Sequence, residues 1–195
     1  MSGHNKWTQI KHQKGAADAK RSKVFSMLSR QITIEAKQAG GDPSTKLGTG
    51  SNHPGLRHAI ERAKAANMPN DNIDRAVEKR LGNRGEGLVE VIYEAYGPCG
   101  AALIITGITD NKNRTSQEIK HLLSLHGGNL AAQGAALWAF GKTESETGVN
   151  WTANATIPLP ESEKGILLKL ITALEEHADI KNIYTNVADL ETAVN

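Results

Sequence analysis

Positive charge is concentrated at the start of this 195-residue sequence. Residues 1–37 contain eight Lys or Arg and only two acids, Asp18 and Glu35, so the stretch has a net charge of +6. Cations that contact phosphates release condensed counterions, which provides affinity without reading base sequence. The stretch therefore predicts an anionic polymer as partner. The eight cations are Lys6, Lys11, Lys14, Lys20, Arg21, Lys23, Arg30 and Lys37.

One aromatic residue, Trp7, lies among the first of these cations. An aromatic ring in a basic segment can stack on an unpaired base, as in proteins that bind folded RNA or single strands. The alternative is that Trp7 packs against helices of its own domain. The nucleic-acid-binding residues that we predict here are Lys6, Trp7, Lys11, Lys14, Lys20, Arg21, Lys23 and Arg30.

A second candidate segment, residues 110–114, joins a buried strand to a helix. Loops on a rigid sheet often carry function, and Asn113 and Arg114 are the predicted contributors to a partner contact. The alternative is a turn and helix cap, in which Asn and Asp bond nearby backbone.

Enzyme chemistry is not indicated. The seven His residues are scattered, and His121 and His126 lie five positions apart without a carboxylate at metal-ligand spacing. Cys99, the single cysteine, has no activating base near it in the sequence. We therefore predict no catalytic residue, no metal and no cofactor. A single cysteine, without an apolar run of signal or membrane length, predicts a cytoplasmic protein with no membrane partner.

The charges divide the chain into two parts. Residues 1–84 hold 16 cations and 7 acids, whereas residues 85–195 hold 7 cations and 14 acids. The net charges are thus +9 and −7, although the whole chain carries only +2. This division predicts two domains, a basic one over 1–84 and an acidic one over 85–195.

The basic domain is expected to contain an arm and three helices. Residues 1–15 show no sustained period and predict an extended arm that orders on binding. Apolar residues from Phe25 to Ala39 recur at helical spacing, and Lys23, Arg30 and Lys37 fall on the opposite side of that helix. Further helices are predicted over 55–66 and from an Asn70 cap to Leu81.

The acidic domain alternates strands and helices. Residues 88–96 predict a strand with Glu90 and Glu94 on a wet face, and 101–109 predict a central strand that is apolar on both faces. A capping box from Thr115 to Glu118 predicts a helix start. The other predicted segments are a strand, turn and strand over 130–140, a polar stretch without clear structure over 141–156, a helix from Pro160 and a strand over 180–187. Together these predict an α+β multidomain protein, with three N-terminal helices before an antiparallel sheet that has helices packed on one face.

Several blocks together resemble the YebC/PmpR family, which includes the mitochondrial translational activator of cytochrome oxidase. The resemblance implies a non-enzymatic regulator of gene expression, either a DNA-binding transcriptional regulator or a ribosome-associated translation factor. The blocks are Ser2 to Arg30, Leu56 to Pro69, Tyr93 to Gly100, Thr109 to Thr115 and His126 to Leu130.

Three features depart from the family pattern. Members usually carry a further α/β domain between the strand ending near Phe140 and the segment resuming around Trp151, where this chain has only the polar stretch over 141–156. The loop from Ser44 to His53 is longer than usual, and Cys99 stands where glycine is common.

We predict a nucleic-acid-binding regulator that acts as a monomer. Duplex DNA is the first target class by resemblance, although no helix-turn-helix spacing is visible. Structured ribosomal RNA is the alternative, which a basic arm with Trp7 would suit, and the acidic domain would then approach a protein, a tRNA or the peptidyl-transfer region. A protein-interaction adaptor that uses its acidic surface is a third class.

Overall fold

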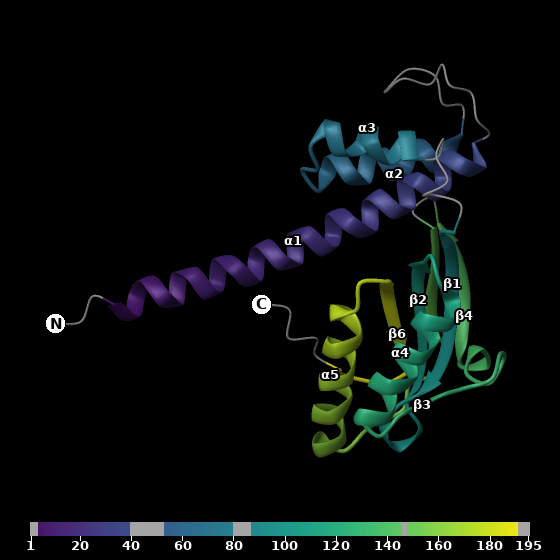
Figure 1. Cartoon of the computed structure of the whole chain (residues 1–195). Helices are drawn as coiled ribbons and strands as arrows, with labels where there is room; N and C mark the ends of the chain where they lie inside the picture. The colour runs from purple at the N-terminus through teal and green to yellow at the C-terminus, as the bar shows by residue number, and fades with distance from the viewer. Residues whose placement is uncertain (1–3, 40–52, 80–86, 146–147, 191–195) are drawn as a thin grey trace. The chain divides into compact units, whose positions relative to one another are not determined.

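The computed structural model describes residues 4–39, 53–79, 87–145 and 148–190 (Figure 1), and within the first helix it describes side chains from Lys20 onward. The chain divides into two compact units, residues 1–86 and 87–195, which are called here the first and second unit. The expected boundary at Arg84 lies outside the described residues, as does the expected loop from Ser44 to His53 except for His53 itself.

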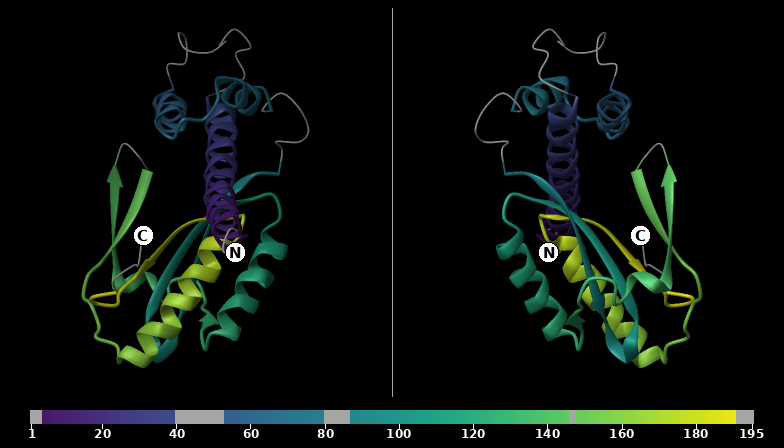
Figure 2. Two further views of the ribbon diagram at one scale, coloured as in Figure 1. Left: turned by 90° about the vertical axis from the view of Figure 1, so that its left-hand side faces the viewer. Right: turned by 90° about the vertical axis from the view of Figure 1, so that its right-hand side faces the viewer.

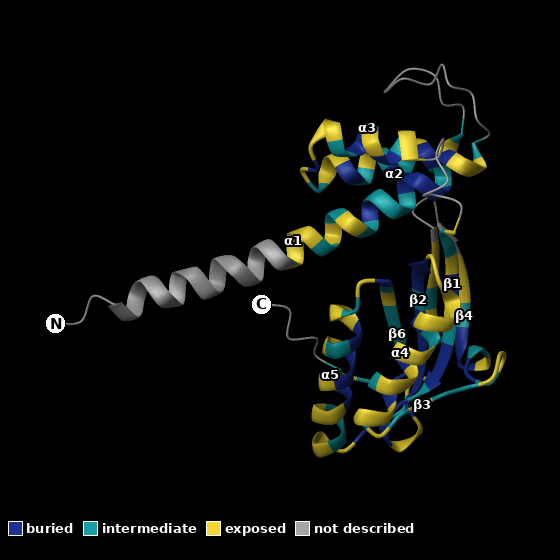
Figure 3. Ribbon diagram, in the orientation of Figure 1, coloured by how far each residue is buried: buried dark blue, intermediate teal, exposed yellow. Residues whose placement is uncertain are grey.

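The first unit is built from α1 (His4–Gln38), α2 (Pro54–Ala65) and α3 (Asn70–Glu78). Their core begins at Phe25, among the side chains described, and joins the C-terminal half of α1 to the two shorter helices. Figure 3 shows the same change along α1, from exposed positions near Lys20 to buried positions near Ala36. The buried core residues are Leu28, Ile32, Ala36, Leu56, Ala59, Ala63, Met68, Ile73 and Ala76.

The predicted extended arm is wrong, because α1 begins at His4 rather than near Ala16. The arm was inferred from the lack of an apolar period before Gly15, but such a period reports that a helix packs on something, not that it is helical. Lys, Gln and Ala are good helix formers, and one interior glycine costs only about 1 kcal/mol. The basic segment is therefore part of a continuous helix.

The ends of the shorter helices depend on local hydrogen bonds. His53 precedes α2, and its Nδ1 accepts the backbone N–H of Leu56 at 3.3 Å. After α2 the chain turns at Asn67, which has a left-handed φ of 59°. The predicted cap at Asn70 is wrong: Pro69 holds the cap position and Asn70 is the first residue of α3, without a side-chain cap bond.

The second unit contains an antiparallel sheet of four strands in the order β3-β1-β2-β6. The helices α4 (Lys112–Leu125) and α5 (Glu161–Glu176) lie together on one side of it (Figure 2). This confirms the α+β class and the helices on one face of the sheet. The strands are β1 (Val89–Tyr96), β2 (Ala102–Thr109), β3 (Asn129–Leu130) and β6 (Ile180–Thr185).

The central strand β2 is buried on both faces, as its apolar run predicted. Leu103 and Ile105 pack in the core formed with α4 and α5. Ala102 and Ile104, on the opposite face, pack in a second core with residues of the segment 136–153. Successive residues of a strand point to opposite faces of the sheet. Every second residue of β2 therefore packs in the first core, and the residues between them pack in the second.

The segment that covers the second face differs from its prediction. Only Asn129–Leu130 pair as the short strand β3, and Leu137–Ala139 form the 3₁₀ turn η4 rather than a strand. The stretch over 141–156, predicted to lack clear structure, contains the antiparallel hairpin of β4 (Phe140–Ser145) and β5 (Gly148–Ala153). Buried Phe140 and half-buried Trp151 anchor this hairpin to the second core.

Among the helices of the described ranges, none has the length and apolar character that a membrane span requires.

Candidate nucleic-acid interface

The candidate interface is centred on α1, which has 35 residues and, at 1.5 Å per residue, a length of about 50 Å. Lys6, Trp7, Lys11 and Lys14 fall in the N-terminal part, where the structure gives the helical backbone but not the side chains. At 100° per residue these four positions fall within an arc of about 140° around the helix axis. These positions of the N-terminal part of α1 therefore share one side of the helix.

The cations nearer the core differ in exposure. Lys20, Arg21 and Lys37 are exposed, whereas Lys23 and Arg30 are half-buried and already have interactions within the protein. The heptad spacing of Lys23, Arg30 and Lys37 places them on one side of α1, opposite buried Ile32. Lys20 and Arg21 are thus the most accessible predicted residues whose side chains are described.

Other cations of the first unit extend the charged surface. Arg57 and Lys64 of α2, and Arg75 and Lys79 near α3, are exposed. Arg62 differs, because its Nη1 donates to Gln31 Oε1 at 3.4 Å and so links α2 to α1. The exposed cations therefore come from all three helices of this unit.

The second predicted segment is engaged inside the second unit. The guanidinium of Arg114 lies 2.8 Å from Asp110 and 3.0 Å from Asp179, and its Nε lies 3.9 Å from Glu118. Hydrogen bonds to Asp179 and then Asp110 raise the pKa of Arg114 above its ordinary value. A partner contact by Arg114 remains a prediction and would have to compete with these carboxylates. Asn113 is exposed in the first turn of α4.

The predicted capping box at Thr115 is wrong. The cap of α4 is Asn111, whose Oδ1 accepts the backbone N–H of Arg114 at 3.1 Å. Thr115 is instead buried, and its hydroxyl lies 2.7 Å from Asp179 and 2.8 Å from the hydroxyl of Thr109. These bonds hold the buried carboxylate of Asp179 between the end of β2 and the start of α4.

Replacing Thr115 with Val should test this network, because Val has the same shape without the hydroxyl. We expect Thr115→Val to lower the free energy of unfolding of the second unit by about 2 kcal/mol, since buried Asp179 loses a donor. The matched control is Thr172→Val on exposed α5 surface, which should change it by less than about 0.5 kcal/mol. Urea unfolding measures both, and equal effects would show that the network does not stabilise this unit.

Glu118, His177 and Asp179 place possible metal-ligand atoms within 4.8 Å of one another. The hydrogen bonds of these residues indicate a structural role and not metal binding. His177 Nδ1 accepts the backbone N–H of Asp179 at 3.1 Å, so Nε2 carries the ring proton and donates to Glu118 at 2.8 Å. An Nε2 that ligates a metal must lack that proton, and the Arg114 charge is adjacent. We assign these groups to the structural network.

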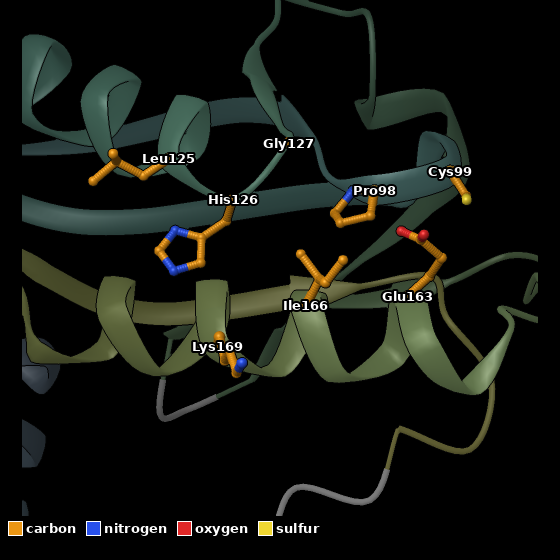
Figure 4. A pocket seen from close by; sticks show the side chains of 8 residues that line it. All are labelled: Pro98, Cys99, Leu125, His126, Gly127, Glu163, Ile166 and Lys169. Atoms are coloured by element: carbon orange, nitrogen blue, oxygen red, sulfur yellow. The ribbon is translucent and has the colours of Figure 1, made fainter.

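A groove of about 480 Å³ is lined by three segments: the turn after β1, the C-terminal end of α4, and the helix α5 (Figure 4). Cys99 lies at one end of it beside Glu163. The lining residues are Pro98, Cys99, Leu125, His126, Gly127, Glu163, Ile166 and Lys169.

Cys99 has a left-handed backbone with φ 52° and ψ 26°. Side chains with a Cβ are strained there, whereas glycine is not. We expect Cys99→Gly to raise the free energy of unfolding of the second unit by about 0.5 kcal/mol, as relief of strain slightly exceeds the entropy cost of glycine. Cys99→Ala removes the thiol but keeps the Cβ, so it should give no gain. Equal stabilities of the two variants in thermal unfolding would contradict the expected strain.

Glu94 was predicted to lie on the wet face of its strand, and this prediction is wrong. It is 5% exposed, and its carboxylate accepts the backbone N–H groups of Gly134, Ala136 and Leu137 at 2.6, 2.7 and 2.9 Å. Burial alone would raise the pKa of Glu94, but these three bonds lower it below the ordinary value of 4.5. Glu94 is therefore a charged anchor for the loop before η4.

Two sequence profiles of one family match the chain. The profile described as "TACO1/YebC protein N-terminal domain" matches residues 5–83, and "TACO1/YebC second and third domain" matches residues 88–145. The second match thus ends with β4, at Ser145.

Similar proteins are found in Petrotoga mobilis and Thermosipho melanesiensis. A protein of Petrotoga mobilis is 55% identical over 141 residues, which make up 72% of this chain and 53% of that protein. A protein of Thermosipho melanesiensis is 55% identical over 141 residues with the same coverage. Both are named "Probable transcriptional regulatory protein". The chain thus spans about half the length of these relatives.

One solved structure supports the fold. The crystal structure of the conserved hypothetical protein Aq1575 from Aquifex aeolicus superposes with a TM-score of 0.75 at 29% sequence identity. The superposition covers 87% of this chain and 91% of that protein.

Proposed function

This chain belongs to the TACO1/YebC family, and on that premise we propose that it is a non-enzymatic regulator of gene expression that binds nucleic acid through its first unit. The names of its relatives support a regulatory role. The local charge supports the choice of partner, since residues 1–84 hold 16 of the 23 Lys and Arg and residues 85–195 hold 14 of the 21 acids.

The main support for this proposal is where the cations and the core residues lie along α1. Its C-terminal half is held by the core with α2 and α3, whereas its N-terminal part extends beyond the first core residue, Phe25, by 21 residues, or about 30 Å. Most cations of residues 1–37 fall in this part. A basic helix fixed at one end can contact phosphates along its length without ordering a flexible arm first.

Duplex DNA is the target class that a straight helix favours. The major groove of B-DNA is about 12 Å wide and admits an α-helix, whereas the major groove of A-form RNA is too narrow for side chains to read. Folded RNA suits a flexible basic arm, whereas these residues form a helix from His4 onward. The cations far outnumber the Asn and Gln suited to bidentate base contacts, so we expect phosphate binding with limited base readout.

Ribosomal RNA is the second candidate, and Trp7 is the feature that favours it. An indole within a basic segment suits stacking on a splayed base, which structured RNA offers and intact duplex DNA does not. In that case the acidic second unit would face a ribosomal protein or a tRNA. We place either action in the cytoplasm.

Three carboxylates of the second unit already have partners within that unit. Its carboxylates Glu94 and Asp179 are bonded to groups of the same unit, and Glu118 is bonded to His177. An acid or base in catalysis must instead reach the reacting group of a substrate.

Cross-linking in living cells identifies the target class. We expect sequencing of the nucleic acid attached to the full chain to return promoter DNA for a transcriptional regulator. Ribosomal RNA would establish the second candidate. Recovery of neither, from cells in which the protein is abundant, would contradict nucleic-acid binding and favour the adaptor class.

A further inference from the structure

Trp138 is exposed to an unusual degree for a tryptophan. Its side chain is 72% exposed, whereas its neighbours in η4, Leu137 and Ala139, pack in the second core. Tryptophan contributes large binding energies in protein interfaces and is rarely left so open on a surface.

The backbone that carries Trp138 is held from several sides. The buried carboxylate of Glu94 accepts three backbone N–H groups of residues 134–137. The hydroxyl of Tyr96 donates to the carbonyl oxygen of Ala135, and Asn154 Nδ2 donates to that of Trp138 at 3.1 Å. A side chain presented on a fixed backbone loses little conformational entropy when it binds.

The polar group of the indole is already used inside the chain. Trp138 Nε1 donates to the carbonyl oxygen of Ala135 at 2.8 Å. What the indole offers to a partner is therefore the aromatic ring surface. Such a surface attracts apolar groups and, through its electron-rich face, the cations of Arg and Lys.

The net charge of the second unit favours a cationic partner. Residues 85–195 contain twice as many acids as cations. The ionised carboxylate of Glu94 bonds to the N–H of Leu137, one residue before Trp138, and Glu90 is exposed on the same face of β1. This field repels a phosphate backbone and attracts Arg or Lys.

We propose that Trp138 anchors a docking surface for a basic, arginine-containing segment of a partner protein, with a guanidinium stacked on the indole. The surface belongs to the second unit and acts in addition to the nucleic-acid contact proposed for α1. The rigid loop supplies orientation, and the acidic unit supplies long-range attraction.

A fluorescent nona-arginine peptide tests the docking surface on the full chain. We expect Trp138→Ala to weaken its binding about five- to tenfold, as for a lost cation–π contact, and Trp138→Phe to retain part of the affinity. Leu125→Ala is the matched control, because Leu125 is 64% exposed elsewhere on the same unit. It should bind the peptide like the unchanged chain.

Three results would overturn the proposal. The first is equal nona-arginine binding by Trp138→Ala and the unchanged chain. The second is a loss on Trp138→Ala that appears with oligouridine and not with nona-arginine, which would make Trp138 a base-stacking residue. The third is self-association that Trp138→Ala abolishes, which would make a second copy the occupant. Removing the α1 cations should not weaken nona-arginine binding, so this test is independent of the proposed function.

Discussion

Replacing five cations of α1 with Gln should weaken binding to duplex DNA by roughly a thousand-fold or more near 0.1 M salt, if each contacts a phosphate. The loss follows from counterions that are no longer released, so the slope of log affinity against log salt should flatten by about 4 to 5. Fluorescence anisotropy with a labelled duplex over a salt series measures both quantities. The five substituted residues are Lys11, Lys14, Lys20, Arg21 and Lys23.

The second unit provides a control with the same change in net charge. Five of its lysines can be replaced with Gln, and we expect the affinity and the salt slope to remain close to those of the unchanged chain. A comparable loss in both variants would mean that net charge alone governs binding and that α1 is not the contact. The control residues are Lys112, Lys120, Lys142, Lys169 and Lys181.

Replacing Glu94 with Gln should lower the free energy of unfolding of the second unit by about 3 kcal/mol. Gln keeps one acceptor oxygen but turns an NH₂ donor toward backbone N–H groups, which leaves buried donors without acceptors. For a unit of this size the midpoint of thermal unfolding should fall by roughly 10 to 15 °C. Glu90→Gln, at an exposed position on the same face of the same strand, should change the free energy by less than about 0.5 kcal/mol.

The effect of Glu94 should depend on pH in one direction. Its folded-state pKa lies below the ordinary value of 4.5, so the ionised form stabilises the fold above that pH. As pH falls through the folded-state pKa this stabilisation is lost, and the difference between the unchanged chain and Glu94→Gln should shrink. A difference that stays constant from pH 7 to pH 3 would contradict the role of the charge.

Most elements of the fold could be predicted from apolar periodicity. The run from Ala101 to Thr109 indicated a strand buried on both faces, and β2 has that burial. The stripe from Phe25 to Ala36 indicated which side of α1 packs. In both cases the pattern lies within one element, so a short stretch of sequence contains the information.

The N-terminal part of α1 could not be predicted by the same reasoning. A helix can form without an apolar period, and then only its propensity indicates it in the sequence. The cations of the candidate site were nevertheless evident, because clustering of charge is a property of composition. The sequence did not indicate that all these cations lie on one helix.

Contacts between distant segments account for the other misses. Glu94 meets the N–H of Gly134 across 40 positions, and Arg114 meets Asp179 across 65. The partners of Glu94 are backbone N–H groups, which nearly every residue type has. The sequence around position 134 therefore gave no sign of them, and Glu94 resembled an ordinary exposed acid. The most direct sequence signal for a special role was an acid in an otherwise apolar stretch, Glu94-Ala95, before the turn at Gly97.

The central claim is that α1 is the part of the chain that contacts nucleic acid. Photo-cross-linking the full protein to its nucleic acid, followed by mass spectrometry of the attached peptides, tests this claim most directly. We predict that the cross-linked peptides fall within residues 4–38, with Lys20 and Arg21 among them. Cross-links confined to residues 87–195 would contradict the claim.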